Sequence, residues 1–280
     1  MREIKKAKEM FLWSQRHKNH GKTVGFVPTM GALHEGHLSL ISEAKIKCDM
    51  VVVSIFVNPT QFSPAEDYNN YPRNYKNDKN TLKKMEVDVL FMPEVPEMYP
   101  PGTKTFVEVE GLSKRLCGIS RPTHFRGVAT VVAKLFDIVA PDIAFFGEKD
   151  YQQQLIIKQM VRDLNLPLEV VSLPTIREFD GVAKSSRNIN LNERERKAAG
   201  VLFKALKMAK EEIEKGEKDP KRLIMRLRSL IAGEPLFRID YVVLADPETL
   251  EDAKHISGKV LIALAGYVGK TRLIDNMVVG

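Results

Sequence analysis

His34 and His37 stand three residues apart in the segment V-P-T-M-G-A-L-H-E-G-H. An apolar run precedes this segment and a helical pattern begins near Glu35, so the spacing predicts both imidazoles on one side of a first helical turn. Imidazoles donate hydrogen bonds to phosphate oxygens and exchange a proton near neutral pH. The N–H groups of a first turn lack partners within the helix and also attract anions. The segment therefore predicts a phosphate site, and a polar turn with two surface histidines is the alternative.

Two later segments also follow apolar runs and contain cations. In F-F-G-E-K-D-Y-Q-Q, Lys149 offers a point charge for a phosphate, and Gln153 offers an amide suited to substrate hydroxyls. Asp150 fits equally well as the cap of the helix that follows. In A-K-S-S-R-N, two hydroxyls lie between Lys184 and Arg187 and form a compact anion clamp. A solvated linker is the alternative for this last segment.

Two more segments add polar groups. F-V-N-P-T-Q-F places Asn58 and Gln61 after an almost wholly apolar run, beside the histidine segment. R-P-T-H-F-R-G-V places Arg121, His124 and Arg126 at the start of an expected helix, where they suit a carboxylate or phosphate. An Asn-Pro turn and a plain basic helix entry are the alternatives.

The elements that must position these groups alternate along the first two thirds of the chain. The expected strands are 23–27, 50–57, 87–92, 143–146 and 168–173, and the expected helices are 35–46, 75–85, 125–139 and 150–164. This alternation predicts βαβ units and a parallel, Rossmann-like α/β sheet. The phosphate-type segments follow predicted carboxyl ends of strands, where open α/β sheets bind ligands.

The alternation of expected strands and helices ends near Asn188. Two helices, 192–215 with Asn192 as N-cap and Gly216 as its stop, and 218–233, precede three β-rich runs at 238–244, 260–265 and 271–278. These runs predict a smaller α+β domain with an antiparallel sheet. The predicted domains are therefore 1–187 and 188–280.

The composition is that of a globular protein with a sizeable core, since 44% of the 280 residues are hydrophobic and 28% are charged. No apolar stretch approaches the roughly 18 residues of a membrane span, and the charged N-terminus lacks the apolar region of a signal peptide. Cys48 and Cys117 form neither a disulfide framework nor a zinc site, which favours a reducing cytosol. The net charge of +7 suits an anionic partner, either a nucleotide or a nucleic acid, and a solvated surface rich in Lys and Glu is the alternative that accounts for most of it.

Several common catalytic patterns are missing from the sequence. Nothing fits the P-loop G-x-x-x-x-G-K-[ST], no G-x-G-x-x-G follows a strand, and no Cys/His spacing suits a metal. No nucleophile elbow is present. The remaining pattern is a set of cations, imidazoles and amides around an anionic ligand.

Taken together and in order, PTMGALHEGH, FVNPTQF, DYNNYPRN, RPTHFRGVATVVAKLF, FFGEKDYQQ and KSSRN resemble the pantothenate synthetase family, the pantoate–β-alanine ligases. The H-x-G-H segment with the later Lys/Ser/Arg segment also resembles the wider nucleotidyl-transferase superfamily. The resemblance spans nearly the whole chain and is looser in the C-terminal part. The chain departs from the family at Lys184, where Met is common, and at Thr123, where Gly is frequent.

The resemblance implies that pantoate and ATP form pantoyl adenylate and pyrophosphate, and that β-alanine then yields pantothenate and AMP. Mg²⁺ would enter with ATP, held mainly by the phosphates, and the resemblance implies no bound organic cofactor. It also implies a cytoplasmic homodimer without nucleic-acid or membrane partners. A carboxylate is already ionised at pH 7, so the first step needs positioning and charge neutralisation rather than a general base.

The resemblance further assigns residues to these substrates. The expected catalytic residues are His37, His34 and Lys149, with both imidazoles on the α-phosphate and His37 as proton donor to the leaving group. The residues expected to bind ATP are Met30, Gly31, Ala32, Leu33, His34, Glu35, Gly36, His37, Gly147, Glu148, Lys149, Asp150, Ile176, Lys184, Ser185, Ser186 and Arg187. The residues expected to bind pantoate are Gln61, Gln153, Arg121, His124, Val131, Val132 and Phe146. The residues expected to bind β-alanine are Gln61 and Asn58.

Two rival hypotheses remain at this point. Another H-x-G-H enzyme, a small nucleotidylyltransferase, would retain AMP or CMP in its product, whereas a ligase releases free AMP. A nucleic-acid-binding protein would use the basic surplus, but the cations are spread along the chain without a basic tail or aromatic-interleaved patch.

Overall fold

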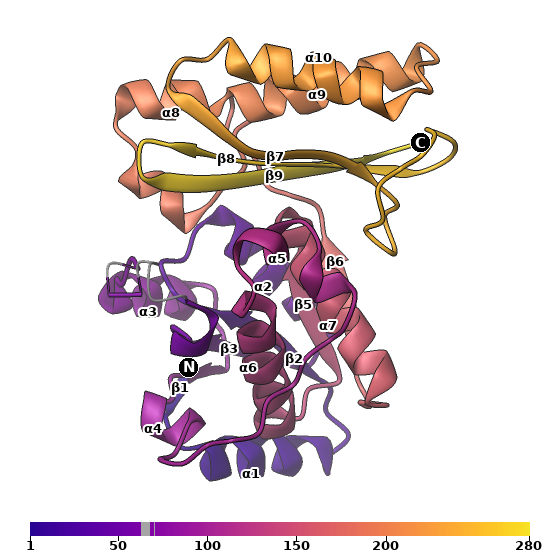
Figure 1. Cartoon of the computed structure of the whole chain (residues 1–280). Helices are drawn as coiled ribbons and strands as arrows, with labels where there is room; N and C mark the ends of the chain where they lie inside the picture. The colour runs from indigo at the N-terminus through magenta and orange to yellow at the C-terminus, as the bar shows by residue number, and fades with distance from the viewer. Residues whose placement is uncertain (63–67, 70) are drawn as a thin grey trace. The chain divides into compact units, whose positions relative to one another are not determined.

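The computed structural model describes residues 1–62, 68, 69 and 71–280, which form two compact units. The first contains 1–114, 118–148 and 153–174, and the second contains 115–117, 149–152 and 175–280. The strands of the first unit are β1 (Arg2–Ile4), β2 (Val24–Thr29), β3 (Met50–Ile55), β4 (Val89–Phe91), β5 (Ile143–Gly147) and β6 (Glu169–Leu173). They form one parallel sheet in the order β1-β4-β3-β2-β5-β6 (Figure 1). This sheet confirms the predicted α/β class.

Helices cover both faces of the parallel sheet. The helices up to residue 163 are α1 (Ala7–Lys18), α2 (Glu35–Lys47), α3 (Tyr75–Lys84), α4 (Val95–Met98), α5 (Cys117–Ser120), α6 (His124–Val139) and α7 (Tyr151–Asp163). Val51, Val53 and Ile55 of β3 are buried in one cluster with the apolar residues of α2 and α3. On the opposite face, the Phe26 ring of β2 meets the Phe136 ring of α6 edge to face, with centroids 6.4 Å apart. Successive strand residues therefore bury opposite faces, as a doubly covered sheet requires.

The second unit has the predicted antiparallel sheet. Its elements are α8 (Glu193–Ala199), α9 (Val201–Glu214), α10 (Pro220–Ala232), β7 (Phe237–Ala245), β8 (Val260–Val268) and β9 (Thr271–Val279). The strands pair in the order β7-β8-β9, and the three helices cover one face of the sheet (Figure 1). Leu206, Leu223 and Ile262 are fully buried between them. An α+β arrangement with its own core results.

Two details differ from the sequence expectations. The long continuous part of the second unit begins at Thr175 rather than at 188, because the segment after β6 is bound to β9 by Arg177. The prediction of one helix over 192–215 is wrong, since Gly200 separates α8 from α9. Glycine is a poor helix former, and its N–H here bonds the Lys197 carbonyl three residues back.

Asn192 and Gly216 do act as predicted. The Asn192 side chain accepts the N–H groups of Arg194 and Glu195, and Gly216 has a φ of +99° just after α9. Across the described part of the chain, no helix combines the length and the apolar character that crossing a membrane would take.

Candidate active site

The two histidines form a reciprocal cap at the start of α2. The N–H of Gly36 donates to Nδ1 of His34 at 3.1 Å, and the N–H of His34 donates to Nδ1 of His37 at 3.3 Å. The ring centroids are 4.1 Å apart. A Cβ on Gly36 would lie 2.9 Å from the His34 ring, so glycine makes room for this imidazole. The turn after β2 thus presents both rings side by side.

These bonds determine where the imidazole protons lie. A ring nitrogen that accepts an N–H carries no proton itself, so the neutral forms of His34 and His37 carry their proton on Nε2. Both rings are therefore hydrogen-bond donors through Nε2, which is the role a phosphate oxygen requires.

The same bonds correct one expectation about the helix N-terminus. The N–H groups of Gly36, His37 and Leu38 are not left for an anion, since His34 accepts all three through its ring or its carbonyl. A capping side chain satisfies the donors that the helix geometry leaves over. Anion binding at this turn thus depends on the imidazoles more than on the amides of α2.

Asn58 and Gln61 lie in a short 3₁₀ helix (Pro59–Gln61) and its cap after β3 and are both buried, at 1% and 7% exposure. Nδ2 of Asn58 donates to Oε1 of Gln61 at 3.2 Å and to the carbonyl of Gly127 at 3.0 Å. Nε2 of Gln61 contacts the sulfur of Met30 at 3.1 Å. The Gln61 amide is therefore fixed next to the histidine turn, as predicted from the strand order.

The start of α6 packs directly on this 3₁₀ helix. Nδ1 of His124 donates to the carbonyl of Gln61 at 2.8 Å, and Arg121 reaches the same oxygen at 3.4 Å. A Cβ on Gly127 would lie 2.4 Å from the Thr60 carbonyl, so glycine allows the two backbones to meet. Val131, Val132 and Phe146, which are also predicted to bind pantoate, are buried. Of the residues predicted to bind pantoate, the structure thus brings Gln61, Arg121 and His124 into contact.

Sequence reasoning missed Tyr99 in this cluster. Its hydroxyl donates to Oδ1 of Asn58 at 2.9 Å and lies 3.2 Å from the Thr60 hydroxyl. Burial raises the pKa of the Tyr99 phenol, although both hydrogen bonds lower it, so the hydroxyl remains a donor at neutral pH. Tyr99 follows β4, which neighbours β3 in the sheet. Its place after the carboxyl end of a strand, which also pointed to Gln61, was therefore a signal that could have found it.

In the second unit, a hairpin over 176–184 leads directly into the Lys/Ser/Arg segment, which begins at Lys184. The N–H of Lys184 donates to the Ile176 carbonyl at 2.9 Å, which brings together two residues assigned to ATP. Nζ of Lys184 forms an ion pair with Glu178 at 2.9 Å across the hairpin. This ion pair holds the side chain of Lys184, the residue at which the chain departs from the family pattern, against the hairpin.

The other cations assigned to ATP are half-buried. Ser185 caps a 3₁₀ helix (Ser186–Asn190) by accepting the N–H of Arg187 at 3.3 Å. Nζ of Lys149 lies 3.6 Å from Asp150, and Asn276 of β9 donates to the Lys149 carbonyl at 2.8 Å. Three neighbouring residues belong to the first unit instead: Gly147 and Glu148, which are assigned to ATP, and Gln153, which is assigned to pantoate.

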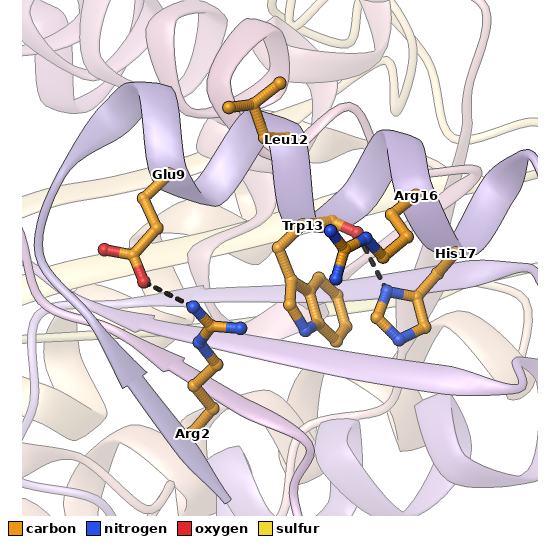
Figure 2. Close-up of a pocket in the computed structure, with 6 residues that line it drawn as sticks. All are labelled: Arg2, Glu9, Leu12, Trp13, Arg16 and His17. Atoms are coloured by element: carbon orange, nitrogen blue, oxygen red, sulfur yellow. Dashed lines mark hydrogen bonds and ion pairs between the residues drawn. The ribbon is translucent and has the colours of Figure 1, made fainter.

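Two other features complete the comparison with the sequence predictions. The DYNNYPRN motif includes residues 67 and 70, which lie outside the described residues. A surface pocket of about 490 Å³ is lined by β1 and α1 (Figure 2). Its lining residues are Arg2, Glu9, Leu12, Trp13, Arg16 and His17. None of these six residues is among the predicted site residues.

Comparison with known proteins decides the family. The family model described as pantoate-beta-alanine ligase matches residues 2–278. The chain belongs to the pantoate–β-alanine ligase family. It is 54% identical over 279 residues to a pantothenate synthetase of Heliobacterium modesticaldum, a match that covers 100% of this chain and 99% of that protein. The Thermosipho africanus pantothenate synthetase is also 54% identical and is covered over its full length.

Solved structures agree with the membership of this ligase family. The crystal structure of pantothenate synthetase from Thermus thermophilus matches with a TM-score of 0.94, at 45% identity and 99% coverage of both chains. A pantoate-beta-alanine ligase from Francisella tularensis, complexed with beta-gamma ATP and beta-alanine, matches with a TM-score of 0.79 at 36% identity, covering 99% of this chain and 97% of that one. The chain is thus an ATP-dependent ligase that joins pantoate to β-alanine, as the motifs predicted.

Proposed function

We propose that the ligation proceeds through an adenylate. A carboxylate oxygen of pantoate attacks the α-phosphorus of ATP, the bond to the β-phosphate oxygen breaks, and pyrophosphate leaves with the electron pair. The amine of β-alanine then attacks the acyl carbon of pantoyl adenylate, AMP leaves, and the nitrogen loses a proton to give pantothenate. Mg²⁺ enters with ATP in this proposal. Such chemistry requires donors and cations on the phosphates, and the residues assigned to ATP are of these types.

The observation that carries this proposal is the fixed pair of His34 and His37, whose Nε2–H groups are both donors. We assign these two donors to the α-phosphate and the departing pyrophosphate. The amide of Gln61, with Asn58 beside it, is assigned to pantoate and β-alanine. Lys149 and the residues from Lys184 to Arg187 are assigned to the phosphates of ATP on the basis of the family motifs.

The proposal is tested by measuring AMP formation from Mg-ATP while pantoate and β-alanine are omitted in turn. AMP is expected only when both are present, and exchange of pyrophosphate into ATP is expected with pantoate alone. Exchange that requires β-alanine would contradict a free adenylate step. AMP formation independent of pantoate would contradict the substrate assignment.

Replacing Gln61 with alanine is expected to lower kcat/KM for pantoate by about 10- to 100-fold, because a buried hydrogen bond to an ionised substrate is lost. The KM for ATP is expected to change far less. Steady-state kinetics with each substrate varied in turn measure both. Gln159→Ala is the matched control, since that amide bonds only Asp163 and Arg162 of α7 in the contacts described. A Q61A enzyme with unchanged pantoate kinetics would remove Gln61 from the pantoate site.

We further propose that the enzyme is a cytoplasmic homodimer. The family resemblance supports both statements, and the thiols of Cys48 and Cys117, which form no disulfide, agree with a reducing compartment. Light scattering coupled to size exclusion measures the mass directly, and a monomeric mass at micromolar concentration would contradict the dimer.

A further inference from the structure

The buried carboxylate of Asp78 binds the turn that precedes the imidazole pair. Asp78 belongs to α3 and is 1% exposed. Its Oδ2 accepts the N–H of Ala32 and its Oδ1 accepts the N–H of Leu33, each at 2.9 Å. These two residues immediately precede His34, so α3 is tied to the histidine turn through one bidentate carboxylate.

The backbone of this turn explains why such a tie is needed. Gly31 and Ala32 have φ values of +83° and +50°, in the left-handed region that a residue with a side chain rarely adopts. The Thr29 hydroxyl accepts the N–H of Gly31 at 3.1 Å and donates to the Ser54 carbonyl at 2.8 Å. Thr29 and Asp78 together therefore satisfy three consecutive N–H groups of a strained turn.

We propose that Asp78 is a positioning residue for His34 and His37 in the adenylation step. This inference rests on the proposed function of the two imidazoles. Asp78 acts through the Ala32 and Leu33 amides, which fix the start of α2 and with it the direction of both Nε2–H groups. Only a carboxylate fits this place well, because both of its oxygens accept hydrogen bonds. An Asn amide would direct its NH₂ group against one of the two N–H donors.

The test compares D78N with D88N in pantoate-dependent pyrophosphate exchange. Asp88 is a matched control, because its Oδ2 also accepts a backbone N–H, that of Val51 at 2.8 Å, but within the sheet. D78N is expected to lower kcat by about 10- to 100-fold, since small displacements of catalytic groups have effects of this size. The KM for pantoate is expected to change much less. D78N with the kcat of D88N would overturn the proposal.

A second readout does not depend on activity. In ¹⁵N-histidine NMR spectra, the Nδ1 signals of His34 and His37 report whether both nitrogens still accept N–H groups. D78N is expected to shift these signals, D88N is expected to leave them in place, and equal spectra would overturn the proposal. A wild-type enzyme without pantoate-dependent exchange would refute the proposed function, whereas the spectra would still test Asp78.

D78E keeps the test decisive if D78N does not fold. It retains both acceptor oxygens on a longer side chain, so the fold is expected to persist while the turn is displaced. If D78N folds, the kcat of D78E is expected to lie between those of D78N and the wild-type enzyme. If D78N does not fold, the kcat of D78E is expected to lie below that of D88N. A D78E kcat equal to that of D88N, in the absence of a folded D78N, would overturn the positioning role.

Discussion

Replacing His37 with alanine is expected to lower the rate of pantoate-dependent pyrophosphate exchange by about 10²–10³-fold, the usual loss when one preorganised donor is removed. Nδ1 of His37 accepts the His34 N–H at 3.3 Å, so the neutral ring presents its Nε2–H as a donor. Negative charge moves onto the departing pyrophosphate as the carboxylate attacks. A donor that is fixed in place before the reaction therefore stabilises the transition state, where this charge develops, more than it stabilises the ground state. The measurement is incorporation of labelled pyrophosphate into ATP.

His37→Asn separates this chemistry from the capping role of the ring. The Asn side-chain oxygen can accept the N–H of His34, but no group then occupies the place of Nε2. The exchange rate is therefore expected to fall as far as in H37A, while thermal unfolding stays near wild type. His20→Ala is the control, because His20 is exposed and its ring bonds the Arg16 carbonyl at the end of α1. A near-wild-type rate in both His37 variants would contradict the assignment.

The parallel sheet was predictable because its signals are local. Runs such as 50–57 are apolar almost without interruption, and polar turns with Gly or Pro bound them. β1 was not predicted, because three residues among charged neighbours show no periodic pattern. Pairing with β4, 85 or more residues later, makes them a strand and buries Ile4. The break between α8 and α9 was missed because the apolar pattern continues across Gly200.

The positions of the candidate site residues in the elements were predictable, and their long-range contacts were less so. The position of His34 and His37 follows from strand, turn and helix, all of which are local. The burial of Asp78 does not, because its partners lie 45 and 46 residues away and the surrounding sequence reads as a polar helix. Gln61 is similar, since His124, 63 residues later, fixes its backbone. Tertiary packing decides such contacts, and local patterns do not contain them.

The second large effect is expected at the ion pair of Arg177 and Asp275. The guanidinium binds both carboxylate oxygens, at 2.7 and 2.9 Å, and the side chains are only 18% and 2% exposed. Arg177 also lies over the Phe203 ring at 4.6 Å and donates to the Gly181 carbonyl at 3.0 Å. The pair therefore binds the hairpin over 176–184 to β9.

Arg177→Met is expected to destabilise the second unit by about 3–5 kcal/mol, because the Asp275 carboxylate stays buried without its cation. Hydrogen exchange should accelerate in peptides from 176–187 and from β9, and remain unchanged in β3. The matched control is Arg196→Met, which breaks the more exposed pair with Asp180 and is expected to cost about 1 kcal/mol or less. In R177M/D275L, an apolar contact replaces the buried pair, so much of the lost stability should return. If the double variant is no more stable than R177M, the buried charge is not the cause and the loss lies in the packing of Arg177 on Phe203.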